Sequence, residues 1–165
     1  PRLFAAAAAA PKPSGPARLI IASTRRNQGS AVSRLKTLSY LDNILARREA
    51  AAADADEAVM LNTRGEVACA AAANLFWRSR GRLFTPALAC GVLDGIIRGE
   101  LLARARAEGQ PIEEVALSAA ILADAQALVL TNSLIGVRAV SSLDGRSLDS
   151  ADMAEKLGAW IEALT

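Results

Sequence analysis

The sequence has no histidine, only two cysteines, and few aromatic residues, 4% of 165. The lack of imidazole excludes Ser-His-Asp and Cys-His nucleophile pairs, histidine metal sites and imidazole general bases. Cys69 and Cys90 are too few for a structural zinc site or a disulfide scaffold, so we expect free thiols in a reducing, cytoplasmic setting. The small net charge of +2 argues against a nucleic-acid-binding protein.

Lysine is also scarce, so few side chains can supply a nucleophilic amine. Arginine supplies most of the positive charge, and the lysines are Lys12, Lys36 and Lys156. Lys36 lies between two leucines just before a predicted helix. The positive end of a helix repels a cation, and that repulsion with partial burial favours an amine free to attack a carbonyl. The simpler alternative is a solvated lysine at a helix start.

The chain starts with an alanine run at residues 5–10, followed by a segment rich in proline, glycine and serine at residues 11–16. The run is too short and too weakly apolar to span a membrane, and it lacks the basic flank of a signal peptide. We expect residues 1–17 to be a linker with the end of a missing N-terminal domain. Residues 18–165 are then expected to form one domain.

Hydrophobic patterning predicts strands and helices in alternation. The predicted strands are residues 18–23, 58–61, 66–71, 74–78, 82–84, 112–117, 127–131 and 134–140, and the predicted helices are 38–53, 95–108, 118–123 and 152–164. Residues 24–30 are expected to be a polar turn, with Arg25 and Arg26 in solvent or, alternatively, on a substrate carboxylate. Strand pairs interleaved with helices indicate an α/β (mixed α+β) domain.

Two segments have the character of anion sites. Residues 91–98 form a glycine-spaced turn that opens a helix, where free backbone N–H groups attract phosphate. An N-cap role for Asp94 is an equally natural interpretation of that turn. Residues 131–133 (TNS) follow a buried strand, a position that often meets ligands in α/β folds. An ordinary polar turn is the alternative for the second segment.

Taken together, six segments resemble one family. They are residues 36–43 (KTLSYLDN), 56–58 (DEA), 73–77 (ANLFW), 85–86 (TP), 91–98 (GVLDGIIR) and 131–137 (TNSLIGV). In this order they resemble the pyridoxal-phosphate (PLP) enzymes of aminotransferase class IV, which have fold type IV. The resemblance runs from about residue 18 to residue 146, and its details are most similar to aminodeoxychorismate lyases. It implies the large C-terminal, PLP-binding domain of these enzymes, without the smaller N-terminal domain.

The resemblance also implies roles for individual residues. Lys36 would be the Schiff-base lysine, and Tyr40 would approach the cofactor. The other implied cofactor-binding residues are Ile96 and Ile97, through their backbone N–H groups to the phosphate, and Asn132 and Ser133, beside the phosphate or the substrate carboxylate. Members of the family are typically homodimers with the active site near the subunit interface, which implies the same for this chain.

One position departs from the family pattern. Members usually carry a glutamate five residues before the asparagine that corresponds to Asn74, and Cys69 takes that place here. The carboxylate keeps the pyridine nitrogen protonated and makes the ring a strong electron sink, whereas a thiol is a poor substitute. Glu66 is three positions away, and an odd displacement along a strand puts its side chain on the opposite face.

This departure favours one reaction of the family over another. Transamination needs negative charge to be stored on the cofactor ring, whereas elimination expels the charge with a leaving group and needs a weaker sink. We therefore expect a 4-amino-4-deoxychorismate lyase of folate biosynthesis, which gives 4-aminobenzoate and pyruvate. The alternatives are a branched-chain or D-amino-acid aminotransferase, and a catalytically degenerate, dimeric member of the family.

Overall fold

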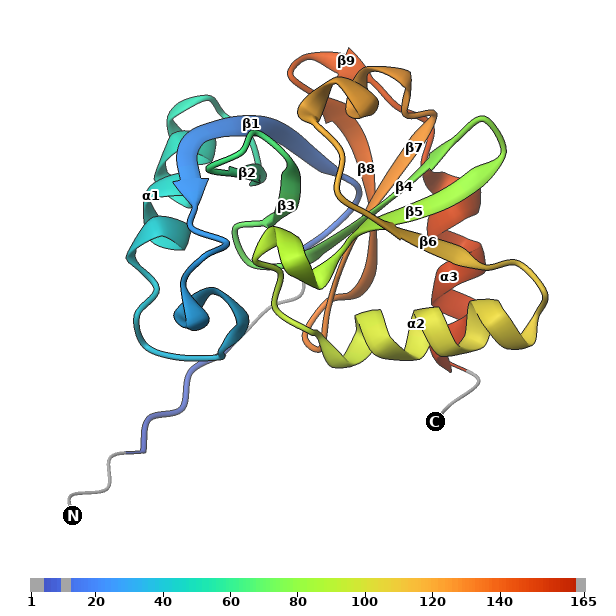
Figure 1. Ribbon diagram of the computed structural model, residues 1–165, viewed down its shortest axis with the longest axis horizontal. Helices are drawn as coiled ribbons and strands as arrows, with labels where there is room; N and C mark the ends of the chain where they lie inside the picture. Colours follow the sequence, from blue (N-terminus) through green and yellow to red (C-terminus); the bar gives the residue numbers. More distant parts are fainter. Residues whose placement is uncertain (1–4, 10–12, 163–165) are drawn as a thin grey trace.

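The computed structural model describes residues 5–9 and 13–162, and in them nine strands form one sheet (Figure 1). The strands are β1 (Ala17–Arg26), β2 (Glu57–Asn62), β3 (Val67–Ala70), β4 (Asn74–Ser79), β5 (Arg82–Pro86), β6 (Ile112–Val115), β7 (Ala127–Asn132), β8 (Gly136–Leu143) and β9 (Arg146–Ser147). The α-helices are α1 (Leu41–Ala52), α2 (Ile96–Ala107) and α3 (Ala151–Glu162), and 3₁₀ turns occupy η1 (Ala31–Arg34), η2 (Leu88–Cys90) and η3 (Ala119–Asp124). The expected mixed α/β class is confirmed.

The sheet order is β3-β2-β1-β8-β7-β4-β5-β6, with β9 paired to β8. The predicted hairpins β2–β3 and β4–β5 are both present and antiparallel. Strand β1 runs parallel to its two neighbours, β2 and β8. It is also longer than predicted: residues 24–26 belong to the strand, and the expected turn is confined to residues 27–30.

Apolar side chains cover both faces of the sheet. Along β4 the two-residue period places Leu75 and Trp77 in a core with β1, β2 and η3, whereas Phe76 packs on the opposite face with α2 and α3. A third cluster lies under α1, where Ala46 and Ala50 pack against β2. Figure 1 shows α1 beside β1 and β2, and α2 and α3 together beside the second half of the sheet. Residues of α1 and of the start of α2 line one cavity, which is described below.

Two of the predicted helices differ from the structure. Helix α1 begins at Leu41 instead of residue 38, because the Thr37 hydroxyl accepts the N–H of Ser39 at 3.2 Å and stabilises a turn there. Residues 119–124 form a 3₁₀ turn after Ser118, whose side chain makes no capping hydrogen bond. Within the described residues, no helix combines the length and apolar character needed to cross a bilayer.

A bulge in β1 is stabilised from α1. The register with β2 shifts between Ile21 and Arg25, which frees the backbone of the residues between them. The N–H groups of Ser23 and Thr24 donate to the Glu49 carboxylate at 2.5 and 3.0 Å, and the Thr24 hydroxyl donates to it as well. These hydrogen bonds lower the pKa of Glu49 from 4.5 to about 2, and the bond from the Thr24 hydroxyl has the largest effect. The helix therefore fixes the path of the strand end.

We predict that Glu49→Gln lowers the free energy of unfolding at pH 7 by about 1–3 kcal/mol, because it removes a charged acceptor of three hydrogen bonds. The folded pKa lies below the unfolded one, so the wild-type protein loses this contribution as the pH falls from about 4.5 to about 2. The difference between the two proteins should shrink over that interval. Urea unfolding at pH 7 and in acid measures it, with exposed Glu155→Gln as the control.

Equal unfolding free energies for wild type and Glu49→Gln at pH 7 would contradict this account of the bulge.

Candidate functional site

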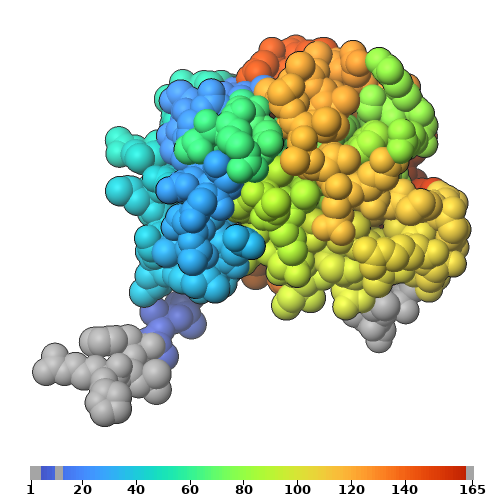
Figure 2. Space-filling model, viewed as in Figure 1, coloured from blue at the N-terminus to red at the C-terminus, as the bar shows by residue number. Residues whose placement is uncertain are grey.

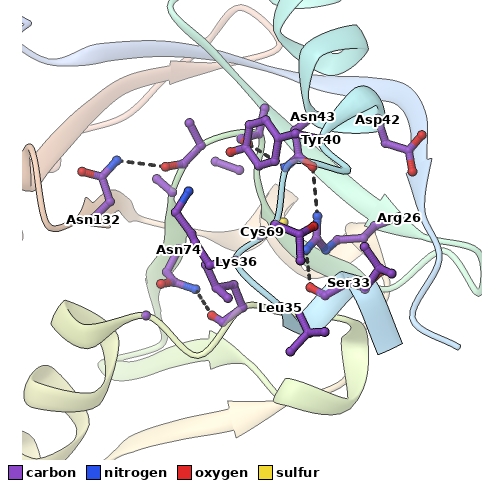
Figure 3. Close-up of a pocket in the computed structure, with 18 of the residues that line it drawn as sticks. Arg26, Ser33, Leu35, Lys36, Tyr40, Asp42, Asn43, Cys69, Asn74 and Asn132 are labelled. Atoms are coloured by element: carbon purple, nitrogen blue, oxygen red, sulfur yellow. Dashed lines mark hydrogen bonds between the residues drawn. The ribbon is translucent and has the colours of Figure 1, made fainter. Parts of the chain in front are cut away.

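A cavity of about 790 Å³ lies where several segments meet. It is lined by residues from the end of β1, the segment before α1, α1 itself, the β3–β4 turn, the loop before α2 and the carboxyl end of β7. Figure 3 shows the side chains that point into it. In Figure 2 the blue segment before α1 lies against a yellow-green surface. A Cβ on Gly91 would come within 2.9 Å of the Gln28 backbone, so only glycine fits.

Lys36 lines the cavity together with Gly95 and Thr131. Its Nζ lies 5.4 Å from the centroid of the Tyr40 ring (Figure 3). Because α1 begins only at Leu41, the expectation that Lys36 sits at a helix start is wrong. Lys36 lies in the loop before α1 and is exposed, so the expected partial burial of its amine is wrong as well. The start of α2 lines the same cavity.

Tyr40 and Asn43 close one side of the cavity. The Tyr40 hydroxyl donates to the carbonyl oxygen of Ala71 at 2.8 Å, and the Asn43 amide donates to the same oxygen at 2.7 Å. Burial raises the pKa of Tyr40 above its ordinary value of 10. The phenol is therefore protonated at neutral pH, and its proton is committed to the β3–β4 turn.

Cys69 forms part of the cavity wall and is 5% exposed. Burial raises the pKa of its thiol to about 11, so the sulfur is neutral at physiological pH. Both cysteines are free, and Cys90 is buried away from the cavity. Glu66 lies outside the cavity as well, where it pairs with Arg64 at 2.7 Å. The carboxylate nearest in sequence therefore does not replace the missing one.

The start of α2 presents unblocked backbone N–H groups. Its N-cap residue, Gly95, makes no side-chain capping bond. Asp94 pairs with Arg98 at 3.2 Å, which rules against the alternative that Asp94 caps the helix. Ile96 lines the cavity, whereas Ile97 is not among the lining residues and its side chain packs against the core beneath α2. Both N–H groups belong to the first turn of the helix.

The end of β7 contributes residues with different surroundings. The Asn132 amide donates to Ala72 O at 2.9 Å, and its oxygen accepts two backbone N–H groups of the following turn, so these bonds hold the side chain in place within the protein. Ser133 is exposed at the rim of the cavity. The Thr131 hydroxyl is buried and has no partner among the described residues.

Asn74 lines the cavity, and its sequence pattern did not single it out as a residue of the site. Its amide donates to the carbonyl of Leu93 at 2.9 Å and so ties β4 to the loop before α2. Its oxygen lies against Gly95, where an added Cβ would come within 2.1 Å of it. The helix start thus keeps its position through a contact that only glycine permits. Position 74 at the start of a predicted strand gave no signal of this pairing.

Comparison with known proteins identifies the family of this chain. The family profile of Amino-transferase class IV matches residues 1–143. The chain belongs to the class IV aminotransferase family. This membership confirms the resemblance that the six sequence segments indicated.

Three relatives show how far the likeness extends. Aminodeoxychorismate lyase of Bacillus subtilis is 32% identical over 117 residues, which are 71% of this chain and 40% of that enzyme. The crystal structure of a candidate 4-amino-4-deoxychorismate lyase from Legionella pneumophila has 33% identity and a TM-score of 0.88, over 93% of this chain and 58% of that one. Branched-chain aminotransferase of Thermobaculum terrenum in its PLP form has 26% identity and a TM-score of 0.84, over 90% and 51%. The chain thus spans about half the length of these relatives.

We predict that Gly95→Ala lowers the free energy of unfolding by about 1–3 kcal/mol, because its Cβ would collide with the Asn74 amide oxygen. Gly99→Ala is the matched control on the same helix. A Cβ there meets nothing within 4 Å, so we expect that variant to be as stable as wild type or more stable by up to about 1 kcal/mol. Urea unfolding measures both variants.

A double-mutant cycle with Asn74→Ala identifies the cause of the loss. The cost of Gly95→Ala should largely disappear when the Asn74 side chain is removed, and an unchanged cost in that background would contradict the assigned contact.

Proposed function

We propose that the intact protein is a PLP-dependent lyase that converts an aminodeoxychorismate-like substrate into 4-aminobenzoate and pyruvate. One observation carries the proposal: a single cavity contains a lysine amine, an uncapped helix start and a neutral thiol. The family membership supports the cofactor, because a relative of similar fold was solved in its PLP form.

The residues of the cavity fit this cofactor. Lys36 would hold the cofactor aldehyde, and the N–H groups of Ile96 and Ile97 would hold its phosphate at the positive end of α2. Ser133 at the rim has a free hydroxyl for the phosphate or for a substrate carboxylate. Cys69 lies in the wall at the place where the family carries the carboxylate that faces the ring nitrogen. The cavity volume of about 790 Å³ lies within the range of small-molecule sites.

When bound, PLP supplies an electron sink for negative charge at the carbon that carries the substrate amine. Lys36 removes the proton from that carbon once its own amine has been released, and it later donates a proton as the product leaves. Tyr40 holds its phenol proton on the β3–β4 turn, so it positions the wall and does not compete as a base.

The neutral thiol favours elimination over transamination. The neutral Cys69 thiol would not balance a protonated ring nitrogen, so it would make the bound cofactor a weaker electron sink than a carboxylate would. Elimination needs a weaker sink than transamination does, because the leaving group carries the charge away. The B. subtilis relative bears the name of the lyase, which agrees with this preference.

An aminotransferase is the second candidate, because branched-chain aminotransferases have the same fold. It predicts that an amino acid converts the cofactor into its amine form and that no pyruvate is released without an amino acceptor. A catalytically degenerate member predicts no covalent cofactor. The lyase that we propose is a cytoplasmic homodimer that acts in folate biosynthesis.

We predict that the intact protein with PLP has a visible absorption band that Lys36→Ala abolishes, because the band requires a covalent bond to that amine. Lys156→Ala on α3 should keep the band. The wild-type protein should release pyruvate from aminodeoxychorismate without an amino acceptor, and Lys36→Ala should lose at least about a hundredfold of that rate. Absorbance and a coupled pyruvate assay measure these outcomes.

Identical spectra for wild type and Lys36→Ala would overturn the enzymatic proposal. A spectrum that depends on Lys36, together with conversion of the cofactor by amino acids and no pyruvate release, would replace the lyase with the aminotransferase.

A further inference from the structure

Arg26 is a buried cation without a counter-ion. It is 9% exposed, at the end of β1, although its position in the sequence indicated a solvated turn. Its guanidinium donates to the carbonyls of Gly91 and Ser33 and, at 3.3 Å, to the amide oxygen of Asn43. All three acceptors are neutral. Among the described residues, no carboxylate forms an ion pair with it.

Arg98 shows what this fold does with its other deeply buried arginine. That guanidinium is 1% exposed and pairs with two carboxylates, Asp94 at 3.2 Å and Glu114 at 2.5 Å. Such pairing is the usual condition for burying a charge, since an uncompensated one is costly. Arg26 therefore lacks the negative partner that a buried guanidinium usually has.

Arg26 and Cys69 line the same cavity, and Figure 3 shows Arg26, Ser33 and Asn43 gathered beside Cys69. Burial raises the pKa of the Cys69 thiol, and the positive charge of Arg26 opposes that rise. The two side chains thus act on each other electrostatically. The glutamate that the family carries at position 69 would supply a carboxylate to this cation, and the cysteine leaves the positive charge unbalanced.

Among the described residues, none of the other ionisable groups of this region pairs with Arg26. Tyr40, before α1, is a protonated phenol bonded to a carbonyl. Glu57 on β2 lies outside the cavity lining and accepts the N–H of Ala58 at 3.0 Å. Burial raises the pKa of Glu57, and its charge raises the pKa of the Cys69 thiol, which is opposite to the effect of Arg26. Arg47 of α1 adds positive charge to the cavity lining, and Asp42 at its rim is exposed and forms no ion pair with Arg26.

We propose that Arg26 and Cys69 together form a site for an aromatic ring nitrogen that carries no proton. The thiol donates its hydrogen to the lone pair of that nitrogen, and the cation of Arg26 repels an N–H⁺ at the same place. The inference rests on the proposed function, since the ring is the pyridine of PLP. In this site, Arg26 sets the strength of the electron sink and so helps to determine the reaction class.

The experiment uses the intact protein loaded with PLP labelled with ¹⁵N in the ring, because the ¹⁵N chemical shift distinguishes a bare pyridine nitrogen from a protonated one. We expect the bare signal in the wild-type protein throughout pH 6–8. Arg26→Met should raise the pH at which that nitrogen takes up a proton by about one unit or more, because it removes a nearby positive charge. The control is Arg25→Met, which changes the exposed neighbour on the same strand and should leave the signal unchanged.

Substitutions of Cys69 keep the test decisive if Arg26→Met fails to fold. Cys69→Glu gives Arg26 a counter-ion and should produce the protonated signal at pH 7, whereas Cys69→Ser, which stays neutral, should keep the bare signal. A protonated nitrogen in wild type at pH 7, or a bare one in Cys69→Glu, would overturn the inference while the proposed function stands. A wild-type protein that takes up no labelled cofactor would overturn both.

Discussion

The cavity depends on one kind of interaction, the hydrogen bond from a polar side chain to a loop carbonyl. Asn43 and Tyr40 bond to Ala71, Asn74 to Leu93 and Asn132 to Ala72. These bonds tie two loops of the cavity wall, the β3–β4 turn and the loop before α2, to the segment before α1, to α1 itself and to the strands β4 and β7. Net contributions of such bonds are modest, about 1 kcal/mol each, but a buried carbonyl left without its donor costs more. Both loops are thereby fixed around an open space without filling it with apolar side chains.

The electrostatics of the site follow from what lines that space. A neutral thiol, a protonated phenol and a cation bonded only to neutral groups occupy one end. The uncapped start of α2 lies at another part of the wall and favours an anion. Such an arrangement suits a ligand with a phosphate at one end and an uncharged ring nitrogen at the other. The preference for elimination proposed above has this distribution of charge as its physical basis.

Local sequence patterns predicted most of the fold, because hydrophobic runs and glycine turns define the two hairpins and the three α-helices. The resemblance to a family predicted which distant segments meet. The structure places Lys36, Tyr40 and Cys69 around one cavity, whereas Ile97 is not among the residues that line it. Long-range contacts escaped prediction. The burial of Arg26 depends on a bulge held by Glu49, 25 residues away from Thr24, and the helix start depends on a contact between Asn74 and Gly95. Neither pairing leaves a trace in the local pattern.

The most direct test of the central claim is to reduce the PLP-loaded intact protein with borohydride and to map the modified lysine by peptide mass spectrometry. Only three lysines, Lys12, Lys36 and Lys156, compete for the aldehyde in this chain. The account predicts one equivalent of phosphopyridoxyl group on Lys36 alone. An unmodified Lys36, with label scattered over the other two lysines or with none at all, would contradict it.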